Sequence, residues 1–349
     1  MKSMKKMVLV GLVLLASVMV LVGCKMEPEG PQGQKVYKFT SEPRILSDYK
    51  SPNNTDSEWT YVAFGDWPQT IKDKDVIVDE TKGWQMGMFT YYLGSDGNYY
   101  VKVTTNPYED GYKYSDESVV EEGEEVYFKV EPIVWRVLNA KDGKYNESEN
   151  PLLLAENILT VGIEWDDSKN NYQESNIRKW LNGNSSDAEE SDYNGYAGFL
   201  QTAFTKTAGN FIVQTIVDNS AQSTNPDSND KQWNSGVNQN ASETKTKDKI
   251  FLLSEQEATM SDYGFAEYTA SGQGNTRIRV TTDYAKAAGA FQSGTTGYGG
   301  IWWLRSPLYV YSCFLNAING AGSADFDYNL NGITSFGIVP ALSISINGN

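Results

Sequence analysis

Histidine is absent from the 349-residue chain, and cysteine occurs only at Cys24 and Cys313. Histidine is the usual general base near neutral pH, the usual partner of a serine or cysteine nucleophile, and the commonest zinc ligand. Its absence argues against those classes of site and leaves Cys313 without a histidine to activate it as a nucleophile. With Cys24 in the N-terminal signal described next, an intramolecular disulfide is not expected, so a hydrophobic core must hold the fold together.

Long apolar runs are also absent, except at the N-terminus. Three lysines precede the apolar stretch 7–22, which is followed by Gly23 and Cys24. A basic start, an apolar stretch and a small residue before the cleavage point are the parts of a secretory signal peptide, and the stretch is short for a membrane span. Its ending, Leu-Val-Gly-Cys, resembles the bacterial lipobox, which implies cleavage before Cys24 and acylation of its sulfur. An ordinary signal peptide with a chance cysteine is the alternative.

We therefore expect a lipoprotein signal peptide over 1–23 and a lipid anchor that holds the protein at the bacterial cell envelope, on the outer-membrane surface. Positive charge is scarce: 29 Lys and Arg stand against 45 Asp and Glu, and loss of the three signal-peptide lysines changes the net charge from −16 to −19. Such a charge opposes binding to nucleic acid or anionic lipid. Residues 24–58, with several prolines among polar residues, are interpreted as a flexible linker.

From Trp59 onwards the pattern is that of a folded domain. Strands are predicted where residues alternate at period two or form short apolar runs, and helices where an apolar period is bounded by capping residues. The predicted strands are 61–65, 99–103, 126–130, 133–138 and 152–155, and the predicted helices are 175–181, 199–204 and 284–291, with a further helix begun by the capping-box pair Ser254 and Glu257. No internal repeat or second linker is found. A single α+β domain over 59–349 with irregular insertions is predicted.

Two apolar stretches near the C-terminus enclose a segment of different character. Trp302 to Pro307 and Gly337 to Leu342 are expected to be buried, with Arg305 ordering backbone carbonyls. Between them, the 29 residues of 308–336 contain tyrosine with Asn, Ser and Gly, the mixture that binding loops use. A segment held at both ends could present these side chains on a surface.

Lys, Glu, Gln, Met and Trp are absent from 308–336. A codon that ends in a pyrimidine cannot encode any of these five residues. Every residue that is present could arise from an Asn codon randomised at its two adenines. The alternative explanation is that Gly- and Asn-rich turn regions are often poor in long charged side chains.

The order of these stretches resembles that in a family of bacterial surface lipoproteins, whose C-terminal domain is similar to the formylglycine-generating-enzyme type of C-type lectin fold. The stretches Trp-Trp-Leu-Arg-Ser-Pro and Gly-x-x-Pro-Ala-Leu carry the resemblance most specifically. Within that group, 308–336 resembles the variable region of diversity-generating retroelement proteins, of the kind known from Treponema. In these proteins an adenine-mutagenised template rewrites a ligand-binding face while the scaffold stays constant.

The resemblance implies a C-type lectin-like fold over 59–349 and a binding function that needs no enzymatic activity, cofactor or metal. The implied partner is a protein or another surface ligand. Leu315, Leu330 and Ile333 are expected to point inward. The residues expected to vary and to bind ligand are Tyr309, Tyr311, Phe314, Asn316, Ile318, Asn319, Asp325, Phe326, Asp327, Tyr328 and Asn331.

Two activities of this fold are not expected here. Its catalytic members use a pair of redox cysteines, whereas Cys313 stands alone, and the Glu-Pro-Asn and Trp-Asn-Asp motifs of calcium-dependent sugar binding are absent. Asp325 and Asp327 would share one face of a strand and could serve as an acid–base pair or a hard-metal site. A carboxylate-dependent hydrolase is therefore an alternative function, as is a structural envelope lipoprotein.

Overall fold

The computed structural model describes residues 37–53, 59–138, 140–141, 144–145, 150–165, 169–183, 197–226, 245–293, 299–308, 311–324, 327–330 and 332–345. The predicted signal peptide and Cys24 lie outside these residues. The described residues belong to one compact unit that begins at Tyr37. None of the helices described in this unit is both long and apolar enough to cross a membrane.

Short helices alternate with many strands along the chain. The strands are β1 (Arg44–Ile45), β2 (Tyr61–Ile71), β3 (Trp84–Met86), β4 (Phe89–Leu93), β5 (Tyr99–Thr104), β6 (Glu125–Val137), β7 (Ala140–Lys141), β8 (Lys144–Tyr145), β9 (Leu152–Ala155), β10 (Ile212–Val213), β11 (Thr215–Asp218), β12 (Lys245–Asp248), β13 (Ile250–Phe251), β14 (Trp302–Pro307), β15 (Phe314–Ile318), β16 (Asp327–Asn329) and β17 (Ala341–Ile344). The α-helices are α1 (Asn176–Asn182), α2 (Phe199–Ala203), α3 (Lys206–Gly209), α4 (Ala221–Thr224), α5 (Glu255–Ala258) and α6 (Asp283–Ala287), and the 3-10 helices are η1 (Glu80–Lys82), η2 (Tyr172–Glu174) and η4 (Ser261–Tyr263).

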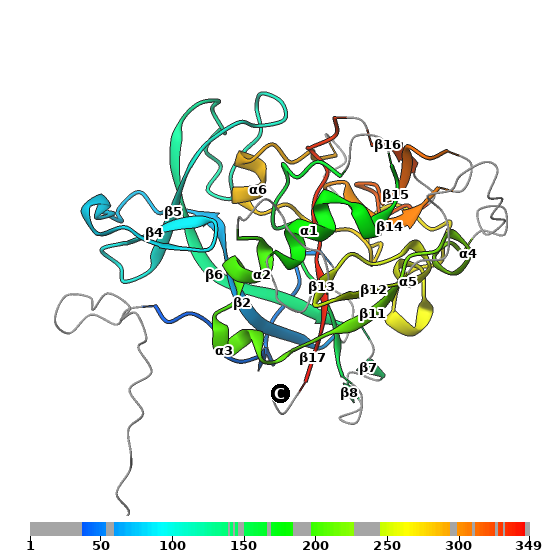
Figure 1. Cartoon of the computed structure of the whole chain (residues 1–349). Helices are drawn as coiled ribbons and strands as arrows, with labels where there is room; N and C mark the ends of the chain where they lie inside the picture. Colours follow the sequence, from blue (N-terminus) through cyan, green and yellow to red (C-terminus); the bar gives the residue numbers. More distant parts are fainter. Residues whose placement is uncertain are drawn as a thin grey trace, which may run out of the picture. The chain divides into compact units, whose positions relative to one another are not determined.

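Most strands join one curled antiparallel sheet, which is ten-stranded in the part of the chain that the structure describes. Its long central pair is β2 and β6, shown in blue and blue-green in Figure 1. The register of this pair shifts between Ala63 and Asp66 and again between Pro68 and Thr70. Gly65, inside the first shift, has a φ of 70°, which a glycine adopts without strain. Such bulges bend a strand and increase its twist, which accounts for the curl. The domain is α+β, as predicted.

Local signals placed several elements correctly. Helix α1 begins after Ser175, whose side chain accepts from the Arg178 amide, and it ends at Gly183. Ser254 and Glu257 form the predicted reciprocal capping box of α5. The predicted strands 126–130 and 133–138 are instead one strand, β6. Pro132 is tolerated inside it because it pairs with Asp66 beside a bulge, where the regular ladder of donors is already interrupted.

The core beside β2 is aromatic. The ring of Trp67 lies 5.0 Å from Phe89, 6.3 Å from Trp180, 5.0 Å from Phe199 and 6.2 Å from Tyr284, measured between ring centroids. These partners come from β4, α1, α2 and α6. Burying large aromatic side chains contributes about 2–3 kcal/mol each, so this cluster is a main attachment of the helices to the sheet.

The predicted linker 24–58 is too long at its C-terminal end, because the compact unit begins at Tyr37 rather than Trp59. Phe39 is 8% exposed and packs against Trp84, Tyr91 and Tyr99. Further along, Arg44 and Ile45 pair with β2. A polar, proline-containing composition indicated flexibility, but one buried aromatic ring and a strand pairing hold this stretch against the domain.

Candidate functional site

The two apolar stretches that enclose 308–336 lie side by side. Trp302 and Gly337 form an isolated parallel bridge. The amide of Trp303 donates to the carbonyl of Gly337 at 3.1 Å, and the amide of Gly337 donates to the carbonyl of Ile301 at 2.7 Å. Both tryptophans are fully buried, as predicted. The beginnings of the two stretches are therefore adjacent, and 308–336 returns to the core beside the start of β14.

The second stretch is not a regular strand over its whole length. Gly337 and Ile338 make isolated bridges, and strand β17 begins only at Ala341. Pro340 lies immediately before that strand. It has no amide hydrogen to donate, so a regular ladder cannot run through it.

Within the segment, β15 and β16 continue from β14 as a three-stranded antiparallel sheet, drawn in orange and red in Figure 1. One face is closed by aromatic rings. Phe336 lies 4.7 Å from Trp303 and 4.9 Å from Tyr328, measured between ring centroids. Leu315, which is paired with Tyr328, is fully buried. The base of this sheet is thus part of the core.

The other face of β15 is held by a buried polar network. Asn316 is 3% exposed, and its side-chain nitrogen donates to Glu255 Oε2 and Asn225 Oδ1, both at 2.7 Å. Asn225 in turn donates to the carbonyl of Pro307 at 3.1 Å, and the Glu255 amide donates to Ser306 Oγ at 2.8 Å. These contacts join the C-terminal end of β14 to β15 and to the segments that carry α4 and α5.

A single asparagine organises the loop between β14 and β15. Asn170 is fully buried, and its side-chain nitrogen lies 3.1, 3.0 and 2.9 Å from the carbonyl oxygens of Leu308, Tyr311 and Phe314. Its backbone amide donates to the carbonyl of Ser312 at 2.8 Å. An amide nitrogen has two hydrogens, so one of the three contacts is shared. Asn170 consequently sets the path of the loop that carries the exposed Tyr311.

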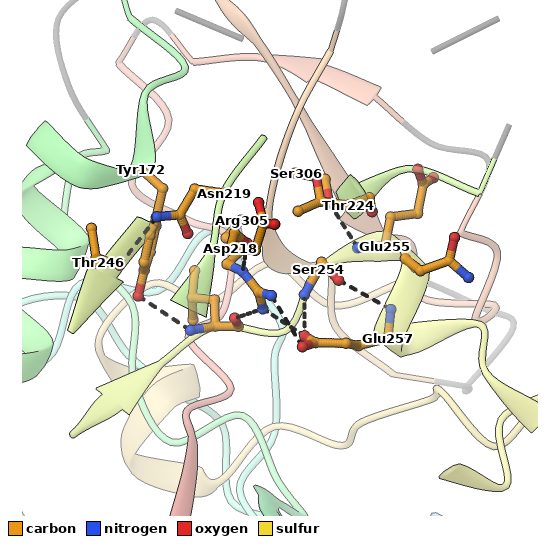
Figure 2. Close-up of polar contacts among 12 residues, drawn as sticks. Tyr172, Asp218, Asn219, Thr224, Thr246, Ser254, Glu255, Glu257, Arg305 and Ser306 are labelled. Carbon is orange, nitrogen blue, oxygen red and sulfur yellow. Dashed lines mark hydrogen bonds and ion pairs between the residues drawn. The ribbon is translucent and has the colours of Figure 1, made fainter. Parts of the chain in front are cut away.

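Arg305 orders backbone carbonyls, as predicted. It donates to the carbonyl oxygens of Leu252 at 2.6 Å and Asp218 at 3.1 Å, and both terminal nitrogens bond Glu257, at 2.5 and 3.0 Å. Figure 2 shows the contacts of Arg305 with Glu257. Burial opposes ionisation of Glu257, but the charge and hydrogen bonds of Arg305 outweigh it, so the pKa of Glu257 is held below its usual range.

An open cleft of about 470 Å³ lies beside this ion pair. Its polar lining includes Asp218, Ser223, Gln256, Glu257 and Arg305. The charged groups of Arg305 and Glu257 already satisfy each other. Among the described residues, the structure contains no group of three or more acidic, cysteine or histidine side chains that could hold a metal ion. The cleft therefore presents hydrogen-bonding groups around an ion pair that is already formed.

The structure separates the predicted ligand-binding residues into several groups. Tyr311 and Tyr328 are exposed by 56% and 39%. Phe314 and Asn319 are half-buried, whereas Asn316 and Ile318 are buried, so the last two cannot belong to an exposed face. Tyr309, Asp325, Phe326 and Asn331 lie outside the described residues, as does the side chain of Asp327.

Three further observations concern which residues of 308–336 are exposed. The side-chain oxygen of Asn319 accepts from the amides of Ala321 and Ser323, at 2.9 and 3.0 Å, so this side chain shapes its own turn. Leu330 is buried, as expected for an inward residue, and Ile333 is half-buried. Sequence reasoning missed the exposed residues Ser312, Gly332 and Thr334. They are small residues close to tyrosine and asparagine in the same segment, and this pattern could have added them to the predicted binding face.

Comparison with known proteins adds one match. Residues 148–346 match the model of a family described as a domain of unknown function, DUF6273. No curated protein and no solved structure matches the chain.

Proposed function

The chain belongs to the DUF6273 family of domains of unknown function, and from its own residues we propose that it is a surface-displayed, lipid-anchored binding protein. Its ligand-binding end is formed by the exposed part of 308–336, and its partner is a protein or another surface ligand. The role needs no enzymatic chemistry. Recognition relies on shape, on aromatic area and on hydrogen bonds.

One observation carries this proposal: 308–336 combines a rigidly held base with exposed aromatic residues. The base is pinned by Asn170, by Asn316 and by the bridge between Trp302 and Gly337. Tyr311 and Tyr328 nevertheless remain exposed. Large rigid amphipathic side chains that are already held in place lose little entropy on binding, which is why binding loops use tyrosine.

The same division supports the finer parts of the proposal. A diversified face needs positions that can change without unfolding the domain, and exposed loop positions meet that need because surface substitutions cost little. The α+β sheet with inserted loops is compatible with a C-type lectin-like fold, which we propose for the domain. We further propose that 308–336 is the variable region of a diversity-generating retroelement protein.

The decisive experiment sequences this locus and its flanks from many clones. Adenine-specific substitutions clustered in codons 308–336, beside a near-copy template, are expected. They should fall on exposed positions such as Tyr311, Ser312 and Tyr328, while Asn316 and Ile318 stay constant. Variation scattered over the chain without a template would remove diversification from the proposal. An Asp325–Asp327 pair that is invariant among sibling copies would favour the hydrolase.

A direct test of binding compares two sibling versions that differ only within 308–336. Both are applied to the same glycan array and the same panel of immobilised purified surface proteins. Different binding profiles are expected, because the scaffold is common to both. A third version, carrying Tyr311→Ala and Tyr328→Ala, should lose the profile of its parent. Identical profiles in all three versions would contradict a ligand-binding role for this end.

A further inference from the structure

Two buried arginines, Arg136 and Arg279, lie next to each other inside the domain. Arg136 is on β6 and Arg279 precedes α6, and they are 1% and 0% exposed. Each donates its Nη1 to the same carbonyl oxygen, that of Thr276, at 3.0 Å and 3.1 Å. Two guanidinium groups that share one acceptor atom are close enough to repel each other strongly.

Both arginines have hydrogen-bond donors left over. Within the described part of the chain, the Nε and Nη2 atoms of Arg136 and Arg279 are buried and have no hydrogen-bond partner. Arg277, two positions before Arg279 in the same stretch, differs. It donates to the carbonyl oxygens of Gly322, Ala266, Glu267 and Ala270 through all three of its nitrogens. Since a buried charged donor without a partner is costly, the four free atoms call for an acceptor.

The charge of this cluster is not balanced by the described residues around it. Glu156 is the described carboxylate whose charge acts on both arginines, and it is 1% exposed. Its Oε1 accepts from Ser51 and, at 3.1 Å, from Asn53, while its Oε2 is buried and has no hydrogen-bond partner among the described residues. One carboxylate against two guanidinium groups leaves one positive charge buried. Burial, and after it the neighbouring Arg279 charge, lowers the pKa of Arg136 to about 9.

Aromatic rings cover Arg136 without neutralising it. The guanidinium carbon of Arg136 lies 4.6 Å from the ring centroids of both Trp59 and Phe265. Such cation–π contacts favour a cation between the rings but leave the in-plane N–H donors unused. The donors at the edge of the guanidinium plane therefore remain available for an acceptor lying in that plane.

We propose that Arg136 and Arg279 together bind a small monovalent inorganic anion, of the size of chloride, inside the domain. Such an ion accepts several N–H donors at once and cancels the excess positive charge. A water molecule could accept from some of these donors, but it would leave the charge in place. The proposal rests on this cluster alone and does not depend on the proposed binding function.

The position of the site gives it a structural consequence. The stretch 276–280 connects three parts of the domain. The Val280 amide donates to Asn53 Oδ1 at 2.7 Å. The backbone carbonyl of Arg277 accepts from Trp302 Nε1 at 3.1 Å. Arg277 Nε also donates to Gly322 at 2.7 Å. An ion bound between Arg136 and Arg279 would thus stabilise the support on which 308–336 rests.

The test measures thermal unfolding of the full-length protein in sodium bromide, with sodium gluconate keeping the ionic strength constant. Gluconate is too large for an enclosed site. Above the dissociation constant, the unfolding temperature should rise by about 2 °C for each tenfold increase in bromide. Arg279→Leu should abolish this rise, whereas Arg277→Leu, the matched buried control with satisfied donors, should keep it. Glu156→Gln, which increases the positive charge, should give the rise at lower bromide concentrations.

A second measurement does not depend on any variant folding. Crystals of the unmodified protein grown in bromide should show an anomalous bromine peak within hydrogen-bond distance of both guanidinium groups. A site filled by a scatterer with no anomalous signal would identify water and overturn the proposal. An unfolding temperature that responds to bromide equally in the unmodified protein and in Arg279→Leu would overturn it as well.

Discussion

Asn316 donates its side-chain amide to the carboxylate of Glu255 at 2.7 Å, although 61 positions separate them in the sequence. Asn316 belongs to the segment expected to vary, yet both partners are buried. The pair therefore divides 308–336 into residues that support the domain and residues that can face a ligand. Variation of the second kind costs little stability, whereas variation at Asn316 removes a buried hydrogen bond.

Replacing Asn316 should show this division as a difference in stability. Asn316→Ala removes a donor from the buried Glu255 carboxylate and should lower the free energy of unfolding by about 3 kcal/mol. Tyr311→Ala, the exposed control in the same segment, should change it by less than about 0.5 kcal/mol. Urea denaturation measures both. Equal losses in the two variants would mean that the segment has no separate supporting part.

Asn170 provides a second test, this time of local order. Asn170→Ala leaves the carbonyl oxygens of Leu308, Tyr311 and Phe314 without their shared donor. The backbone hydrogen bond from the Asn170 amide to the Ser312 carbonyl does not involve the Asn170 side chain, so it can persist in Asn170→Ala. We expect a loss of about 2 kcal/mol. Amide hydrogen exchange of 308–314 should become faster while that of β9 stays unchanged; unaltered exchange in 308–314 would contradict this assignment.

Asp66 should make stability depend on pH. Burial raises the pKa of Asp66 to about 6, even though Tyr37 and Thr40 donate to its carboxylate. A carboxyl group with a raised pKa binds more protons when folded than when unfolded, so its contribution is present below about pH 4 and lost as pH rises to about 6. The loss is about 3 kcal/mol, and above that range the contribution is flat.

The measurement compares urea denaturation of the unmodified protein and of Asp66→Asn between pH 4 and pH 7. The difference between the two curves removes the effect of all other titrating groups. Asp66→Asn should gain stability relative to the unmodified protein as pH rises, because it cannot ionise. A difference that does not change with pH would show that Asp66 keeps an ordinary pKa.

The proposed lipid anchor can be tested by replacing Cys24. Cys24→Ser should abolish incorporation of labelled palmitate and move the protein from the membrane fraction to the soluble fraction. Cys313→Ser is the matched control and should leave both unchanged, because Cys313 lies inside the domain and is half-buried. Labelling that persists in Cys24→Ser would refute the lipobox interpretation.

Sequence patterns identified elements whose determinants are local. Ser175 and Gly183 define the ends of α1, and the capping box of α5 needs only the spacing of Ser254 and Glu257. The hairpin of β3 and β4 was not predicted, although its turn contains a glycine, Gly87. In the structure this glycine has a φ of 58°. Its two strands are short, and the alternation within them is correspondingly weak.

The support of the candidate site could not be predicted in the same way. Asn170 and Glu255 reach 308–336 across 61 to 144 positions, and no local pattern encodes a contact of that range. The burial of Asn316 has the same origin. An asparagine in a Gly- and Asn-rich stretch is normally a surface residue, and only the carboxylate opposite it makes an interior position favourable.

The exposed turn at Gly332, where φ is 67°, bears on how long 308–336 can be as well as on which residues it can carry. The Ile333 amide donates to the carbonyl of Leu330 at 3.4 Å, so the two sides of the turn at Gly332 are already close, and an insertion there has no long distance to span. Closure entropy then rises only logarithmically, by about 0.6 kcal/mol for each doubling of a flexible loop. Insertions at the exposed turn near Gly332 should therefore be tolerated, and copies of this domain could differ in the length of this turn.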